Sequence, residues 1–97
     1  MPSFAARWYR QAQEDLRAAE ASAASGHHEW ACFQSQQAAE KALKAYLYSR
    51  GRTALTTHAL IRLVRICEEL ENDFSALYGD AKFLDTHYIP TRYPNGL

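Results

Sequence analysis

Apolar residues recur along this chain with the 3.6-residue period of an α-helix, in four successive segments. The first begins after Ser3, a suitable N-cap, and ends near Gly26, a residue that often terminates helices. The second contains no Gly or Pro before Gly51, and the third opens on Thr57, another suitable N-cap. No segment shows the alternation of a β-strand, so the pattern predicts an all-α protein. The predicted helices cover residues 4–25, 28–49, 57–71 and 74–88.

Each predicted helix has a stripe of residues expected to face a core. Gln36 lies within the stripe of the second helix, and a buried glutamine at that position needs a polar partner. A strip of small residues runs beside it, where another helix could approach closely. The stripes are Trp8, Ala12, Leu16, Ala19 and Ala23; Cys32, Gln36, Ala39, Leu43 and Leu47; Leu60, Leu63, Val64, Cys67 and Leu70; and Tyr78, Ala81, Leu84 and Tyr88.

Short connections between these helices predict antiparallel neighbours, and therefore an up-and-down antiparallel bundle of four helices. We expect residues 1–97 to form a single domain. Gly79 interrupts the fourth helix, and Pro90 and Pro94 are expected to end regular helix. The sequence stops just after a turn-like Asn95-Gly96, which suggests that a fifth, C-terminal helix is missing. Dimerisation would then cover the groove that the missing helix leaves open.

Composition narrows the classes of protein without naming a partner. The 97 residues are 47% hydrophobic, which is enough for a small core, and 11 basic residues balance 11 acidic ones. Cys32 and Cys67 fall on apolar stripes, so we interpret them as reduced thiols of a cytoplasmic protein. No apolar run approaches the roughly 18 residues of a membrane span. We expect no cofactor.

The charges are segregated along the chain. No acidic residue occurs between Lys41 and Arg65, and an acidic run from Glu68 to Asp73 follows. A basic hairpin of this kind would suit phosphate or a nucleic-acid backbone. The alternative is that these side chains form solvated faces, with some at a helix C-terminus, where cations are favoured. The six basic residues are Lys41, Lys44, Arg50, Arg52, Arg62 and Arg65.

Motifs for nucleophilic or metal-dependent catalysis are not found in the sequence, and His27-His28-Glu29 at a helix start is a weak candidate for a metal site, so we predict none. Arg52 precedes His58 by six positions. Histidine can transfer a proton near neutral pH and arginine can hold a phosphate, which together suffice for metal-free RNA cleavage. Local packing of His58 at a helix start is the alternative.

Two further polar groups are candidates for function. Asp15, Gln36 and Glu40 are expected to form a structural polar network, which serves helix register at least as often as it forms a site. Tyr88 and Tyr93 gather with Arg92 where the fourth helix ends; they could stack on bases and contact phosphate, or simply cover the end of the bundle. The expected nucleotide- or RNA-binding residues are Lys41, Lys44, Arg50, Arg52, Tyr88, Arg92 and Tyr93.

Taken together, these residues resemble the HEPN domain family over roughly residues 7–94. The two most specific parts of the resemblance are the glutamine–glutamate–lysine helix and the closing tyrosine–proline motif. The matching residues are Trp8, Asp15-Leu16, Gly26, Ala31-x-Phe33-x-x-Gln36-Gln37-Ala38-x-Glu40-Lys41-x-x-Lys44, His58-x-Leu60 and Tyr88-Ile-Pro-Thr-Arg-Tyr-Pro94.

The resemblance implies a helical bundle that forms a homodimer and binds RNA or nucleotide. It also implies a partner nucleotidyltransferase, the two acting as a toxin–antitoxin pair. Several HEPN proteins are metal-independent ribonucleases with an Arg-x(4–6)-His motif. At the usual position of that motif this chain has Lys82 and His87, with Arg92 nearby, and Arg52 with His58 is the alternative catalytic pair. A non-catalytic module for protein interaction and dimerisation is the competing interpretation.

Overall fold

A computed structural model describes the backbone of residues 3–92 and the side chains of residues 3–87. Every regular element in this part of the chain is helical, so the predicted all-α bundle of four helices is confirmed. A short 3₁₀ helix, η1, adds a turn between the last two α-helices. The elements are α1 (Phe4–Ala24), α2 (His28–Ser49), α3 (Leu60–Leu70), η1 (Asn72–Leu77) and α4 (Tyr78–Arg92).

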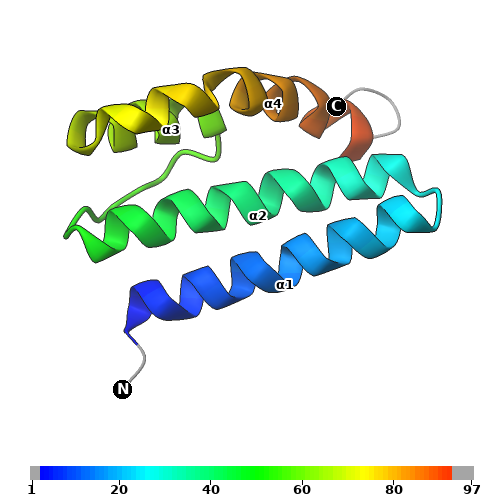
Figure 1. The fold of residues 1–97 in the computed structure, drawn as a ribbon, viewed down its shortest axis with the longest axis horizontal. Helices are drawn as coiled ribbons and strands as arrows, with labels where there is room; N and C mark the ends of the chain where they lie inside the picture. The colour runs from blue at the N-terminus through cyan, green and yellow to red at the C-terminus, as the bar shows by residue number, and fades with distance from the viewer. Residues whose placement is uncertain (1–2, 93–97) are drawn as a thin grey trace.

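The helices are arranged in three layers, with α2 in the middle (Figure 1). On one side α1 runs antiparallel to α2, and Gly26, whose φ is +82°, makes the tight turn between them. On the other side α3 and α4 pack on α2. Within the described residues α1 contacts no helix other than α2. The bundle is therefore open along α1.

The apolar core lies between α2, α3 and α4. The stripe predicted for the third helix is confirmed, with Leu63 and Cys67 fully buried. Leu16 is a correction: predicted to be buried, its side chain is 51% exposed. One neighbouring helix covers only a narrow strip of α1, and that strip is centred on Ala12 and Ala19. The core residues are Leu43, Leu47, Leu60, Leu63, Val64, Cys67 and Ala81.

Ser3 and Thr57 were predicted to be the N-caps of the first and third helices, and the structure gives a different outcome for each. The Ser3 side chain accepts a hydrogen bond from the Ala6 N–H at 3.0 Å, which confirms it as the N-cap of α1. The Thr57 cap is wrong, because α3 begins three residues later, at Leu60. Its first amides are capped from α4 instead: Asp85 accepts hydrogen bonds from the N–H groups of Leu60 and Ile61 at 2.9 and 3.0 Å.

The fourth helix also differs from the prediction. Gly79 lies in the first turn of α4 and does not interrupt it, because the break in the helix comes earlier, at η1. The helix continues past Pro90 to Arg92. A proline lacks a backbone N–H and was therefore expected to end the helix, but α4 ends two residues after Pro90.

Candidate functional site

A charged cluster is buried along the middle of α2. Glu40 accepts a hydrogen bond from the Lys44 ammonium at 3.1 Å, and their side chains are only 8% and 5% exposed. The Lys44 Nζ also lies 5.8 Å from the centre of the Trp8 ring on α1, within cation–π range. The second carboxylate oxygen of Glu40, Oε1, is buried with no hydrogen-bond partner among the described residues. A buried pair of this kind is costly to desolvate, so it adds little net stability over well-packed apolar residues.

His58 joins this cluster from the loop before α3. Its Nδ1 lies 3.0 Å from Glu40 Oε2, while 74% of the side chain is exposed. The backbone carbonyl of His58 accepts a hydrogen bond from buried Gln36 at 3.0 Å, which explains why a glutamine lies in the apolar stripe. The carboxylate thus holds one ring nitrogen and leaves Nε2 toward solvent. This arrangement orients an imidazole for proton transfer at the surface.

Asp15 lies outside the Gln36–Glu40 network. It forms an ion pair with Lys41 and accepts a hydrogen bond from Gln11 at 3.0 Å. The ion pair ties α1 to α2, whereas the hydrogen bond from Gln11 lies within α1. The structure therefore places the three residues in two separate groups, with Gln36 and Glu40 joined through His58.

The basic hairpin faces the acidic run that follows it in sequence. Arg50 lies 3.4 Å from Glu71, and Arg52 lies 3.5 Å from Glu69. The Tyr46 hydroxyl donates a hydrogen bond to Glu71 at 2.8 Å, and desolvation, reinforced by this carboxylate, raises the pKa of Tyr46. Both arginine pairs are long and largely exposed, so they hold the arginines only weakly.

Neither candidate catalytic pair converges within one chain. Arg52 reaches the C-terminal end of α3, whereas His58 precedes its N-terminus, and a helix of 11 residues is about 16 Å long. Lys82 and His87 are five positions apart on α4, which rotates them by about 140° around the helix axis. His87 Nδ1 lies 2.8 Å from the carbonyl of Phe83, and its ring is 4.3 Å from the Phe83 ring.

The third group of candidates cannot be placed in the same way. The side chains of Tyr88 and Arg92 lie outside the described residues, and so does Tyr93. Their proposed roles remain predictions from the sequence.

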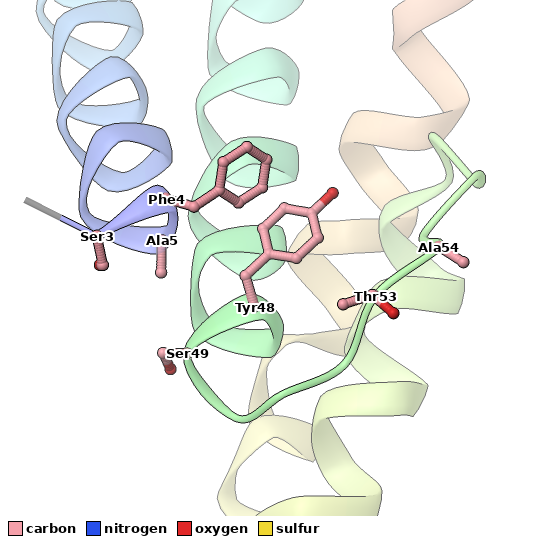
Figure 2. A pocket seen from close by; sticks show the side chains of 7 residues that line it. All are labelled: Ser3, Phe4, Ala5, Tyr48, Ser49, Thr53 and Ala54. Carbon is pink, nitrogen blue, oxygen red and sulfur yellow. The ribbon is translucent and has the colours of Figure 1, made fainter.

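A pocket that the sequence reasoning missed lies where α1 begins and α2 ends (Figure 2). It has a volume of about 730 Å³ and is lined by the rings of Phe4 and Tyr48, whose centres are 5.0 Å apart. The Trp8 ring packs on Tyr48 at 5.4 Å and completes an aromatic cluster. Hydroxyl groups and a short loop segment form the rest of the lining, which is Ser3, Ala5, Ser49, Thr53 and Ala54.

The sequence carried a signal for this pocket. Phe4 and Trp8 lie one helical turn apart at the start of the first predicted helix, and Tyr48 lies at the end of the second. Antiparallel packing of two helices joined by a short turn brings those ends together. Phe4 alone is more than half exposed, so the aromatic cluster forms a rim and not a core.

The described residues contain neither a metal-binding cluster nor a membrane-spanning helix. No three His, Cys, Asp or Glu side chains among them gather closely enough to hold a metal ion. None of the helices in residues 3–92 is long and apolar enough to cross a membrane.

Comparison with known proteins identifies the family. The chain matches the model of the HEPN domain over residues 5–97, nearly its whole length. Comparisons with curated proteins and with solved structures each find no match. The matched segment includes both helices of the buried charged cluster, the loop that carries His58, and all of α3 and α4. The chain belongs to the HEPN domain family.

Proposed function

We propose that this HEPN domain binds nucleotide or RNA, with a base stacked in the aromatic pocket between α1 and α2. The observation that carries this proposal is the pairing of Phe4 and Tyr48 in a cavity of about 730 Å³. Every base has a flat π-face, so exposed aromatic rings bind single-stranded nucleic acid with little sequence preference. The hydroxyls of Ser3, Ser49 and Thr53 supply hydrogen-bond partners for a base edge or a ribose.

Basic side chains surround this pocket. Lys41 and Arg7 line a smaller adjoining cavity of about 280 Å³ beside Phe4 and Trp8. Arg50 follows directly after Ser49, and its pair with Glu71 is exposed enough for a phosphate to replace the carboxylate. Lys44 is buried in its own ion pair, so it contributes to the local potential more than to direct contact. Binding through these side chains weakens as salt rises.

Replacement of Tyr48 tests the pocket directly. We would titrate a labelled, mixed-sequence single-stranded RNA and adenosine into the wild-type protein, Tyr48→Ala and Tyr48→Phe. Loss of one stacking ring should weaken binding by roughly 5- to 100-fold in the alanine variant, whereas the phenylalanine variant, which keeps the ring, should bind nearly as the wild type does. Circular dichroism would establish that both variants are folded. Equal affinity for all three proteins would rule out the pocket.

The family resemblance also motivates a catalytic version, in which the protein is a metal-independent ribonuclease. His87 with Lys82 and Arg92 would carry it, or His58 with Arg52. Because neither pair converges in one chain, we infer that a catalytic site would combine residues of two copies in a homodimer. The exposed imidazole of His58, oriented by Glu40, favours His58 as the proton-transfer group of the alternative pair.

Cleavage of a mixed RNA in the presence of EDTA separates these versions. If His87 carries the reaction, His87→Ala abolishes cleavage and His58→Ala retains it, and the opposite result assigns the site to the loop. If neither the wild-type protein nor its mixture with the partner cleaves RNA, the protein is a non-catalytic nucleotide-binding subunit. Mixing the two alanine variants tests the dimer, because a site shared between two copies can regain part of its activity in a mixed dimer.

A second candidate function is an interaction module, and one observation favours it. Within the described residues α1 packs on a single helix and leaves Tyr9 and Leu16, which flank its buried strip, more than half exposed. A second copy of the chain or the nucleotidyltransferase of a toxin–antitoxin pair would cover this face. Light scattering of the wild-type protein and Leu16→Glu, alone and with a nucleotidyltransferase encoded next to it, would test both partners. An unchanged mass and unchanged association in the variant would exclude this face.

A further inference from the structure

A second cleft, of about 450 Å³, is lined in part by the loop that also lines the aromatic pocket. Arg62 and Arg65 lie on its α3 wall, three residues apart and therefore on the same face of the helix, and both side chains are exposed. Thr56 and Thr57 line it from the loop. Two guanidinium groups and two hydroxyls thus converge on one cavity, a combination that suits phosphate oxygens.

These two arginines differ from the other basic residues of the hairpin. Lys41, Lys44, Arg50 and Arg52 each have a carboxylate partner. Among the described residues that line the cleft there is no carboxylate, and Arg62 has no ion pair within that part of the chain. Arg65 lies against the hydroxyl of Tyr78, which in turn donates to Glu68. Arg62 therefore presents positive charge that no ion pair among the described residues neutralises, whereas Arg65 is held by a tyrosine hydroxyl next to a carboxylate.

The start of α3 beside this cleft is closed to an anion. Asp85 accepts hydrogen bonds from the amides of Leu60 and Ile61, so the carboxylate occupies the place where a phosphate would otherwise bind the helix N-terminus. Its negative charge repels a phosphate from that end and leaves the arginine pair as the favourable contact. Thr57 Oγ1 accepts from the Ala59 N–H at 3.1 Å, so its hydroxyl hydrogen remains able to donate.

Ala54 connects the two cavities, because it lines both the aromatic pocket and the arginine cleft. Its φ is +58°, a left-handed conformation that is uncommon for a residue with a side chain. Figure 2 shows Ala54 next to Thr53 on the loop that passes Tyr48. A ligand held by the rings and extended along the loop past this residue would enter the arginine cleft.

We propose that the Arg62–Arg65 cleft binds the terminal phosphates of a nucleotide whose base occupies the aromatic pocket. This rests on the proposed function and specifies its ligand: a nucleoside with phosphate groups at one end. A free nucleoside di- or triphosphate and the 5′-phosphorylated end of an RNA share this chemistry. The cleft thereby discriminates phosphorylated ligands from nucleosides, while the rings bind both.

Calorimetric titration of the full chain with adenosine, ADP and pyrophosphate tests the assignment. We would compare the wild-type protein with Arg62→Ala and Arg65→Ala, and use Arg10→Ala on the exposed surface of α1 as a control that removes the same charge elsewhere. Both cleft variants should lose roughly tenfold to a hundredfold in affinity for ADP and pyrophosphate, and Arg10→Ala little. Affinity for adenosine should not change in any of them. Equal ADP affinity in the cleft variants and Arg10→Ala would overturn the proposal.

The same experiment separates a failure of the cleft from a failure of the proposed function. If adenosine binds and depends on Tyr48 while the arginine variants bind ADP normally, the pocket stands and the cleft proposal is wrong. If pyrophosphate binds through Arg62 and no adenosine binds, the aromatic pocket does not bind a base. The proposal of a nucleotide that spans both cavities is then wrong as well. A preference for 5′-phosphorylated over 5′-hydroxyl RNA identifies an RNA end as the ligand, and tighter binding of ADP than of either RNA identifies a free nucleotide.

Discussion

The two sides of α2 bury different kinds of side chain. Toward α3 and α4 the helix contributes large apolar residues to a core in which Leu63 and Cys67 are fully buried. Toward α1 the buried apolar residues are alanines, and polar contacts and aromatic rings form the margins. An alanine buries less apolar area than a leucine, so each buried apolar side chain contributes less to stability on the α1 side. The large apolar core therefore lies on one side of α2, and the candidate binding pocket lies on the other.

Truncation of a buried leucine in the core and of an exposed leucine on α1 should give the largest contrast. Leu63→Ala removes a fully buried side chain and should lower the free energy of unfolding by about 2–5 kcal/mol. Leu16→Ala, on the exposed surface of α1, should change it by about 0.5 kcal/mol or less. Urea denaturation followed by circular dichroism measures both. Comparable losses would mean that the α1 face is buried in solution, as it would be in a dimer.

The cap of α3 provides the next contrast. Asp85→Ala leaves two backbone amides at the start of α3 without their partner and should cost about 1–2 kcal/mol. Thr57→Ala removes a single contact within the loop and should cost less. Asp85→Asn keeps one acceptor oxygen, so its loss of stability should be smaller than that of Asp85→Ala and larger than that of Thr57→Ala. If Thr57→Ala proved more destabilising than Asp85→Ala, the cap would lie where the sequence suggests.

This cap also shows what sequence can and cannot predict. The bounds of α2, the Ser3 cap and the stripe of α3 depend on neighbours within a few positions, and all were predicted correctly. The Asp85 cap depends on a residue 25 positions away, so no local pattern reveals it. Leu16 was wrongly predicted to be buried for a related reason. Periodicity shows which face of a helix is apolar, but the packing of neighbouring helices decides how much of that face is buried.

The candidate site was harder to predict than the fold. The sequence correctly indicated that Gln36 needs a partner, but that partner is the backbone carbonyl of His58, which any residue at position 58 would supply. The sequence showed the basic hairpin as one group. Its arginines separate only when α3 packs on α2: Arg50 and Arg52 then pair with the acidic run, and the other two arginines line the cleft. The aromatic pocket went unnoticed because its rings come from opposite ends of two helices.

The buried thiol should make stability depend on alkaline pH. Burial raises the pKa of Cys67 from 9.0 to about 11, so the folded protein keeps its proton where the unfolded chain loses it. Stability from this group is therefore complete below pH 9 and falls as the pH rises toward 11. Unfolding midpoints in urea at pH 8 and pH 10.5 should differ more for the wild-type protein than for Cys67→Ala.

Two controls isolate this effect. Tyr46 and Tyr78 also have raised pKa values, which lower stability in the same direction, but both are present in wild type and variant and cancel in the comparison. Cys32→Ala removes the other free thiol, which is only partly buried, and controls for the loss of a thiol as such. An identical pH dependence in Cys67→Ala would show that the Cys67 thiol ionises equally in both states.

Arg50→Ala should have the smallest effect on stability and the most direct bearing on function. The Arg50–Glu71 pair is long and about half exposed, so its loss should change the free energy of unfolding by less than about 1 kcal/mol. If a phosphate replaces Glu71 when RNA binds, the same substitution should weaken RNA binding at low salt. It should also reduce the slope of log affinity against log salt concentration by about one phosphate contact. Arg17→Ala, which breaks an exposed pair on α1, is the matched control and should leave that slope unchanged. A stable Arg50→Ala protein with an unaltered slope would place the RNA backbone away from the end of α2. An altered slope would place the backbone at that end, where Arg50 leaves Glu71 for a phosphate.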